Sequence, residues 1–117
     1  MINLLQETLE CLQENGKSPK DVLWVGSSDG GCAISWGNFS KIADFEYDNE
    51  YGCREIVSDL VIVGDNWWLE RGEFAGAEWW DFKTTPHKQP SAKQFYKVYP
   101  ASWDKLAEIQ NEPDQTA

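Results

Sequence analysis

Residues 56–63 read Ile-Val-Ser-Asp-Leu-Val-Ile-Val, the most apolar and most β-branched stretch of the chain. Such a run, followed by the turn-forming residues Gly-Asp-Asn at 64–66, is typical of a strand inside a sheet. Two further β-prone segments follow at residues 67–74 and 78–83, with a second turn between them. These segments predict a three-stranded antiparallel meander, and residues 56–63 are expected to be the central strand of the sheet.

Two helices are predicted before the meander. The first has apolar residues at helical spacing and ends at Asn15-Gly16, a suitable left-handed stop; its apolar stripe contains Ile2, Leu5, Leu9 and Leu12. The second is short, begins after Gly37 or Asn38 and runs to Asp44. Its spacing predicts that Phe39, Ile42 and Ala43 face the core.

Short β-prone runs at residues 22–26 and 32–36 flank a Ser-Asp-Gly-Gly turn and predict a hairpin. Near the C-terminus, residues 95–99 are expected to form an edge strand and residues 102–109 a short helix. The predicted fold class is α+β: a small antiparallel sheet, made of the hairpin and the tryptophan-rich meander, packs with the N-terminal helix and short additional helices. One domain is expected over residues 1–110, followed by a disordered tail at residues 111–117.

The charge of the chain limits its partners. Twenty acidic and ten basic residues among 117 give a net charge of -10. This charge repels phosphate backbones and anionic lipids, so we expect no direct binding to nucleic acid or membrane. It is compatible with simple solubility, with a cation site, or with a protein partner that has a basic surface.

The location of the protein is predicted from its N-terminus and cysteines. The first residues are not a secretory signal, and no segment approaches the length of about 20 apolar residues that spans a bilayer. The cysteines, Cys11, Cys32 and Cys53, are odd in number and widely spaced. We therefore expect a cytoplasmic protein with reduced thiols, each buried as a small apolar side chain.

The most distinctive feature is a pair of tryptophan doublets on the last two strands of the predicted meander. Because successive side chains of a strand face opposite ways, each doublet is expected to turn one indole inward and one outward. The outward indoles and nearby charges could form a binding platform, for which eight residues are candidates: Trp67, Trp68, Glu70, Arg71, Glu73, Trp79, Trp80 and Asp81. A sheet covered on both faces would instead bury all four indoles, and this alternative stays open.

Other motifs point to no catalytic or metal chemistry. The acids from Asp44 to Glu55 are spaced like a calcium loop, but Asn49 stands where that loop needs glycine, so a solvated acidic loop is the better interpretation. A single histidine, His87, and scattered cysteines disfavour zinc. Carboxylate pairs could serve a glycosidase, but the chain is short for such a cleft. We predict no catalytic residue, no metal site and no cofactor.

Several motifs resemble short acidic proteins encoded by phages and prophages of Gram-positive gut bacteria. The resemblance covers residues 4–82 and rests on GKSP at 16–19, WVGS at 24–27, IADFEYD at 42–48, DLVIVGD at 59–65, WWLER at 67–71 and EWW at 78–80. It carries over no activity, cofactor or site residue. It implies a setting in which small accessory proteins act by stoichiometric binding, for example of a host nuclease or a nucleotide messenger used in defence.

These observations lead to two expected functions. The first is a non-enzymatic accessory protein of the bacterial host cytoplasm that binds a host or defence protein through its acidic, tryptophan-rich surface. The second is a module that binds or sequesters a small aromatic ligand or sugar between exposed indoles. Self-association through exposed aromatic residues is a further alternative.

Overall fold

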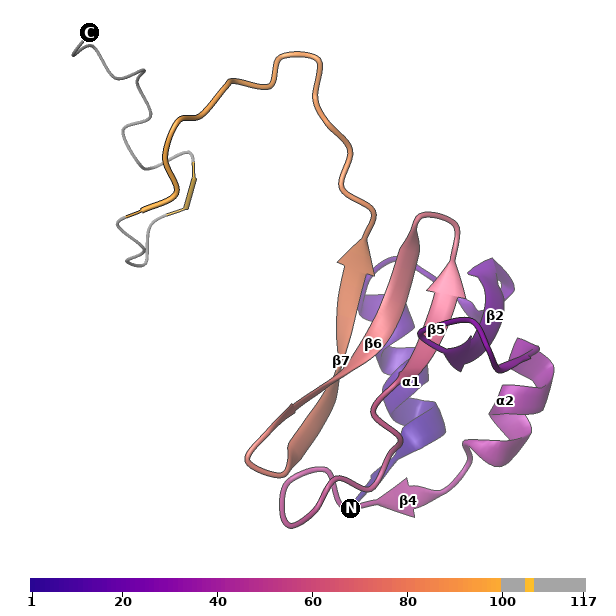
Figure 1. Cartoon of the computed structure of the whole chain (residues 1–117). Helices are drawn as coiled ribbons and strands as arrows, with labels where there is room; N and C mark the ends of the chain where they lie inside the picture. The colour runs from indigo at the N-terminus through magenta and orange to yellow at the C-terminus, as the bar shows by residue number, and fades with distance from the viewer. Residues whose placement is uncertain (100–104, 107–117) are drawn as a thin grey trace, which may run out of the picture. The chain divides into compact units, whose positions relative to one another are not determined.

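The computed structural model describes residues 1–99 and 105–106. The chain divides into two units, residues 1–85 and 86–117, and all described helices and strands lie in the first. Their order is β1 (Ile2–Asn3), α1 (Leu4–Glu14), the 3-10 helix η1 (Pro19–Asp21), β2 (Val22–Ser27), β3 (Ala33–Ile34), α2 (Trp36–Ile42), β4 (Glu46–Tyr47), β5 (Leu60–Gly64), β6 (Trp67–Phe74) and β7 (Ala77–Thr84) (Figure 1). The predicted α+β class is confirmed.

Five strands form one antiparallel sheet in the order β3-β2-β5-β6-β7 (Figure 1). The hairpin β2-β3 and the meander β5-β6-β7 are both confirmed, and β5 is the central strand. It begins only at Leu60, so the first four residues of the predicted strand lie outside it. Ala75 and Gly76 join β6 to β7 with φ angles of 52° and 90°, the positive values that a tight hairpin turn of type I′ requires.

Helix α1 is capped by Asn3, whose side chain accepts a hydrogen bond from the amide of Gln6. Its buried residues are Leu4, Thr8 and Leu12, whereas the predicted stripe residues Ile2, Leu5 and Leu9 are only partly buried. The difference comes from Thr8. Its hydroxyl donates to the Leu4 carbonyl and accepts from the indole of Trp80, 72 residues away, which places a polar residue at the centre of the buried face.

Helix α2 begins at Trp36, one residue after Ser35, whose hydroxyl accepts from the amide of Asn38. The cap is therefore Ser35 and not Gly37 or Asn38. Phe39 and Ala43 are buried as predicted, but Ile42 is 67% exposed. The prediction for Ile42 is wrong because only the side of the helix that carries the other two residues meets the core.

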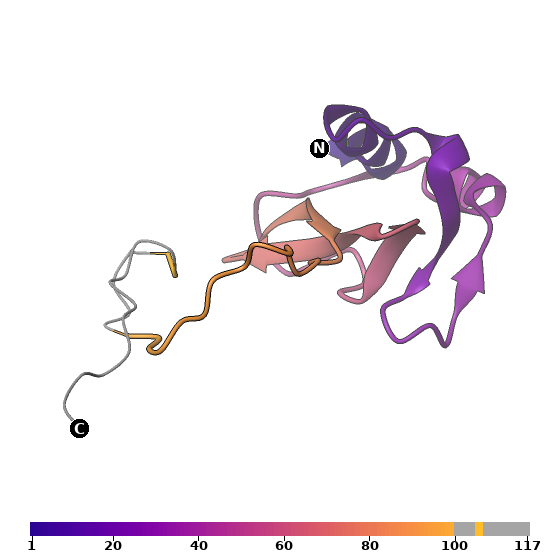
Figure 2. The ribbon, with the colours of Figure 1, turned by 90° about the horizontal axis from the view of Figure 1, so that it is seen from above.

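The core lies on one face of the sheet, called the inner face. One row of it runs across four strands in register, from Val25 through Ile62 and Leu69 to Phe82, and the first three of these are fully buried. Helix α1 lies over this face (Figures 1 and 2), and Leu4, Leu12 and Phe39 belong to the same cluster. Burial of this apolar area stabilises the fold.

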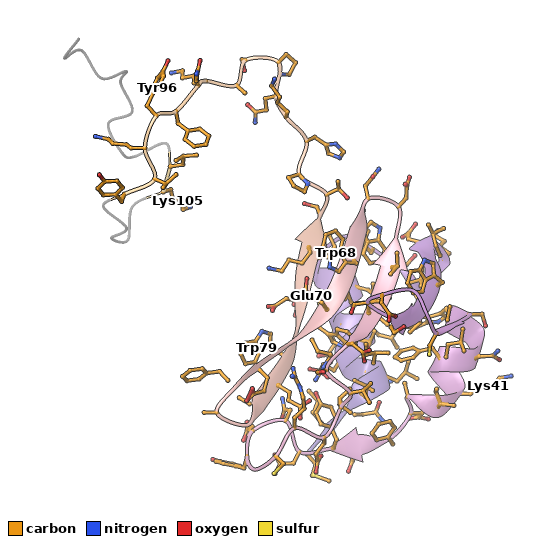
Figure 3. The ribbon with its side chains drawn as sticks, in the orientation of Figure 1. Lys41, Trp68, Glu70, Trp79, Tyr96 and Lys105 are labelled. Carbon is orange, nitrogen blue, oxygen red and sulfur yellow. The ribbon has the colours of Figure 1, made fainter. Side chains whose placement is uncertain are left out.

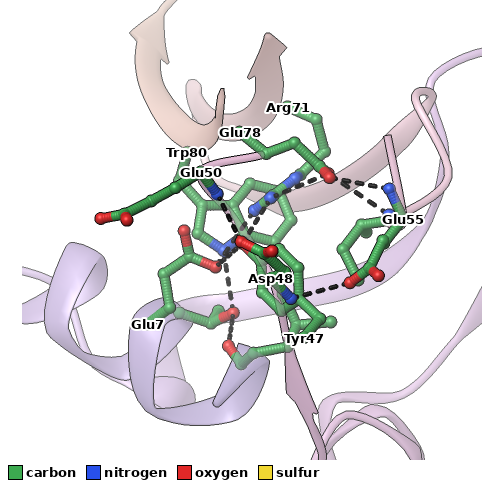
Figure 4. A network of polar contacts seen from close by, with 11 residues as sticks. Glu7, Tyr47, Asp48, Glu50, Glu55, Arg71, Glu78 and Trp80 are labelled. Carbon is green, nitrogen blue, oxygen red and sulfur yellow. Dashed lines mark hydrogen bonds and ion pairs between the residues drawn. The ribbon is translucent and has the colours of Figure 1, made fainter. Parts of the chain in front are cut away.

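A buried polar network joins α1, β4 and β6 (Figure 4). Arg71 of β6 is 6% exposed, and its guanidinium donates to the hydroxyl of Tyr47 over 2.8 Å. The Tyr47 hydroxyl in turn donates to Glu7 of α1 over 2.6 Å, and Arg71 lies 3.4 Å from the same carboxylate oxygen. The guanidinium also lies over the ring of Trp80, 4.6 Å from its centroid. The predicted surface residue Arg71 is therefore interior.

Glu78 of β7 extends this network to the loop before β5. Its side chain is fully buried, lies 3.5 Å from the Arg71 guanidinium, and accepts hydrogen bonds from the amides of Glu55 and Ile56 over 2.7 and 3.3 Å. Its own amide donates to the carbonyl of Asn49 over 2.8 Å. A buried carboxylate is tolerated here because a cation and two backbone donors compensate its charge.

Three expectations for the rest of the chain need correction or fall outside it. Residues 95–99 are described and form no strand, so the predicted edge strand is wrong. The predicted helix at 102–109 lies outside the described residues, except for Lys105 and Leu106. The cysteines are free, but Cys32 and Cys53 are exposed, since they lie in loops; only Cys11 is partly buried, and burial raises its pKa.

Tyr47→Phe tests the buried network. Burial, followed by the hydrogen bond to Glu7, raises the pKa of Tyr47 above its ordinary value of 10.0. The unfolded chain therefore ionises first, so the stabilisation by this phenol is complete below about pH 10 and is lost as the pH rises further. We expect the variant to lose about 1–2 kcal/mol of unfolding free energy near neutral pH. The loss should shrink at alkaline pH in urea titrations. A loss that stays constant, or an equal loss in the exposed control Tyr51→Phe, would contradict the network.

Candidate functional site

The tryptophan doublets of β6 and β7 each turn one indole to each face of the sheet. Trp67 and Trp80 are on the inner face, 4% and 8% exposed, whereas Trp68 is partly exposed and Trp79 is 38% exposed. The predicted alternation is confirmed, and the alternative in which all four are buried is wrong. Figure 3 shows Trp68 and Trp79 on the side of the sheet opposite to α1.

The strand register defines what accompanies these indoles. Trp24, Val63, Trp68 and Lys83 lie opposite one another across β2, β5, β6 and β7. The next row of the same face contains Gly26, Val61, Glu70 and Asp81. We call this face the outer surface and define it by eight side chains: Trp24, Val61, Val63, Trp68, Glu70, Trp79, Asp81 and Lys83.

A hollow of about 290 Å³ lies on the outer surface between two indoles. Trp24 and Trp68 stand on β2 and β6, and the intervening strand β5 supplies Val61 and Val63. Because neighbouring strands are about 4.8 Å apart, the backbones of the two tryptophans are separated by about 10 Å. This width admits a side chain or a planar ring between the indoles.

Two carboxylates lie directly opposite each other beside this hollow. Glu70 and Asp81 are cross-strand partners, and each accepts a hydrogen bond of 2.9 Å from the indole two residues before it, Trp68 and Trp79 respectively. Like charges at opposite positions repel. Within residues 1–99 and 105–106 no ion pair reaches either carboxylate. The indoles therefore orient the pair, and Lys83, the basic side chain of the same surface, forms no ion pair with it.

Gly72 allows Trp79 to lie close to the sheet. A Cβ atom at position 72 would come within 2.4 Å of the Trp79 indole nitrogen and 2.7 Å of an Asp81 carboxylate oxygen. No side chain can occupy that space without moving the ring. The position of the indole, and with it the hydrogen bond to Asp81, thus depends on glycine at this position.

The structure separates the eight predicted residues into three groups. Trp67, Arg71 and Trp80 are buried on the inner face. Glu73 is exposed, but its carboxylate accepts from the amide of Gly76 and belongs to the turn. The outer surface keeps the other four: Trp68, Glu70, Trp79 and Asp81. It adds Trp24, which sequence reasoning missed because the pairing of β2 with β5 joins distant segments.

In the acidic segment between α2 and β5, two carboxylates accept hydrogen bonds from backbone amides of the same segment. Asp48 accepts from the amides of Glu50 and Tyr51, and Glu55 accepts from the amide of Asp48 over 2.7 Å. In the part of the chain that the structure describes, no three His, Cys, Asp or Glu side chains are grouped to hold a metal ion. His87 is exposed.

A second hollow, of about 270 Å³, lies between α2, β2 and the loop before β5. Its walls are apolar, and four exposed apolar residues form part of its lining: Ile34, Ile42, Phe45 and Val57. One charged residue, Glu55, lines it. This hollow could accept an apolar side chain, but it has few groups to orient a polar ligand.

Comparisons with known proteins found no family model, no curated protein and no solved structure that matches this chain. Among the described helices, none has the length and apolarity needed to cross a bilayer.

Gly72→Ala tests the geometry of the outer surface. The added methyl group must displace Trp79, so we expect the Trp79 resonance to shift in ¹⁹F spectra of protein labelled with 5-fluorotryptophan. Unfolding free energy should fall by about 1–3 kcal/mol because of overpacking. The matched control is Gly37→Ala in α2, where the nearest atom to the new Cβ is 3.8 Å away and helix propensity favours alanine. An unchanged Trp79 signal in Gly72→Ala would contradict the close approach.

Proposed function

We propose that the protein is a non-enzymatic binding module whose outer surface holds a basic segment of a partner protein. The observation that supports this proposal is the pair Glu70 and Asp81, which forms no ion pair with any described residue and is flanked by indoles. A guanidinium placed between the two carboxylates would donate charge-assisted hydrogen bonds to both and relieve their mutual repulsion. It could also lie against Trp68 or Trp79.

The charge of the whole chain supports the same class of partner. A net charge of -10 attracts basic surfaces and accelerates their encounter with the protein. This attraction acts over about 8 Å at physiological salt and weakens as salt is added. Short-range contacts at the indoles then determine which basic segment stays bound.

The biological partner in this proposal is a host or defence protein in the bacterial cytoplasm. Its support is the resemblance of the sequence to phage and prophage proteins, together with the acidic outer surface. A partner with a basic nucleic-acid groove would fit this surface, and occupation of the groove would block its nucleic-acid ligand. The protein would then act by stoichiometric binding.

A second candidate is a small ligand, and the hollow between Trp24 and Trp68 favours it. Indole faces stack on sugar rings and bases. Glu70 and Asp81 could accept hydrogen bonds from sugar hydroxyls, whereas they would repel a nucleotide phosphate. Lys83 is the single basic side chain of the outer surface as defined above, so a neutral sugar fits better than a nucleotide.

The first test compares two variants of equal net charge. Glu70→Gln combined with Asp81→Asn removes the outer carboxylates, and Glu10→Gln combined with Glu14→Gln removes two exposed carboxylates of α1. Each variant removes two negative charges and so changes the net charge from -10 to -8. Binding of a peptide of alternating arginine and serine is measured by fluorescence anisotropy. We expect the first variant to bind the peptide about tenfold more weakly, because it loses a charge-assisted contact. The second variant should bind the peptide nearly as well as the wild type. Equal losses would mean that net charge alone attracts the peptide, contrary to the proposal.

The second test distinguishes specific contacts at the indoles from non-specific hydrophobic binding. Trp79→Ser should weaken binding of the arginine peptide about fivefold to thirtyfold, since a desolvated cation–π contact contributes about 1–2 kcal/mol. Phe74→Ser is the control, because Phe74 is 76% exposed but lies at the turn, outside the outer surface. Neutral oligosaccharides are titrated in parallel. Saturable binding of a sugar, abolished by Trp24→Ser, with no binding of the peptide would replace the protein partner by the second candidate.

A further inference from the structure

The free edge of β7 offers a different kind of contact. β7 is the last strand of the five-stranded sheet, so among the described residues no strand pairs with one side of its backbone. The amide of Glu78 points to that side, because it donates to the carbonyl of Asn49 and not to β6. In an antiparallel strand the amide and carbonyl of one residue point the same way, and the direction alternates along the chain. The backbone groups of Trp80, Phe82 and Thr84 therefore face the free edge.

The opposite phase of the strand agrees with this assignment. The amide of Thr85 donates over 3.0 Å to Asn66, which lies in the turn before β6. The backbone amides and carbonyls of the odd-numbered residues in this segment thus point toward β6, and those of the even-numbered residues point away from it. Within residues 1–99 and 105–106, no hydrogen bond reaches the backbone amides of Trp80, Phe82 or Thr84.

This unpaired edge has two definite ends. At one end, the Glu78 amide is already occupied by Asn49. At the other, the next even-numbered residue is Pro86, which has no amide hydrogen. Three consecutive outward positions remain between these ends, and Phe82 is the middle one.

We propose that β7 pairs with β7 of a second copy of this chain, antiparallel and related by a two-fold axis at Phe82. Trp80 then lies opposite Thr84 of the partner subunit, and Thr84 opposite Trp80 of the partner subunit, while the two Phe82 residues face each other. All three outward amides and carbonyls of both copies are satisfied. An isologous contact of this kind closes after two subunits.

The charges of β7 favour the same register. Asp81 and Lys83 both project from the outer face of the sheet. With the axis at Phe82, Asp81 lies opposite Lys83 of the partner subunit, and Lys83 opposite Asp81 of the partner subunit. Opposite charges at facing positions stabilise a strand pair. The register thus forms two ion pairs in addition to the backbone bonds.

Neighbouring registers fail on the same grounds. An axis at Trp80 would place Phe82 opposite Glu78, whose amide is already bonded. An axis at Thr84 would place Phe82 opposite Pro86, which has no amide to donate. An axis at Asp81 would set two aspartates against each other and would place Thr84 opposite Glu78, whose amide is already bonded.

Such pairing goes beyond the proposed function. It joins two five-stranded sheets into one continuous sheet and places the two outer surfaces on the same side of it. It uses the backbone edge of β7, whereas the binding of a basic segment uses the outer surface; Asp81 belongs to both, so the partner's Lys83 and a bound basic segment would compete for it. The molecular mass reports on the first and peptide binding on the second, so the failure of either proposal is recognised separately.

The mass of the full chain in solution tests the pairing. Sedimentation equilibrium is measured over a range of concentrations up to millimolar, at about 0.15 M salt, where screening over about 8 Å limits repulsion between the two net charges. We expect the mass to rise with concentration from 13.4 kDa toward twice that value. A mass that stays monomeric at every concentration would overturn the proposal.

Three variants test the register. Lys83→Asp should weaken dimerisation about tenfold or more, because each ion pair becomes a repulsion. Lys41→Asp is the matched control: it changes the net charge equally, lies on the exposed side of α2, and should weaken dimerisation much less. Adding Asp81→Lys to Lys83→Asp exchanges the charges and should restore the dimer. If Lys83→Asp dimerised as strongly as the wild type, this register would be overturned.

The backbone contribution is tested by Thr84→Pro, which removes an outward amide without removing a bond to β6. We expect it to weaken the dimer, while circular dichroism confirms that the fold is kept. Hydrogen exchange of the amides of Trp80, Phe82 and Thr84 should slow as the protein concentration rises. Dimerisation without protection of these amides would place the contact elsewhere and overturn the proposal.

Discussion

The fold depends on a charge that is held away from water. The Arg71 side chain is completely buried, and a lone cation in that position would be very unfavourable. Glu78 and Glu7 compensate it, while Tyr47 accepts one of its hydrogen bonds. These partners come from α1, β4 and β7, so the network fixes the relative positions of three elements that share few other polar contacts.

The composition of the outer surface follows from this internal constraint. Because side chains alternate along β6, an inward Arg71 requires that Glu70 and Gly72 face outward. On β7, an inward Glu78 likewise sends Trp79 to the other side. A slip of one residue between these strands would bury Glu70 and expose Arg71, and the network excludes that slip. The composition of the outer surface is thus determined by residues of the inner face.

Predictions from the sequence were correct for contacts between residues close in sequence and incomplete for contacts between distant residues. Local patterns predicted the hairpin, the meander and the alternation of the tryptophans correctly, because turns and neighbouring strands lie close in sequence. The burial of Arg71 was not predictable in this way, since its partners Glu7 and Tyr47 are 64 and 24 residues away. Trp24 was missed for the same reason: its place on the outer surface depends on the pairing of β2 with β5. Ile42 shows that helical spacing cannot distinguish two adjacent sides of a short helix.

The facing carboxylates Glu70 and Asp81 have an effect on the isolated protein as well. Their mutual repulsion is an unfavourable contribution that the free fold carries permanently. Any cation that settles between them removes it, and by thermodynamic reciprocity the fold then resists heat and denaturant better with its ligand than alone. The repulsion thus slightly destabilises the protein alone, and a cation bound as in the proposed function would reverse it and raise the melting temperature of the domain.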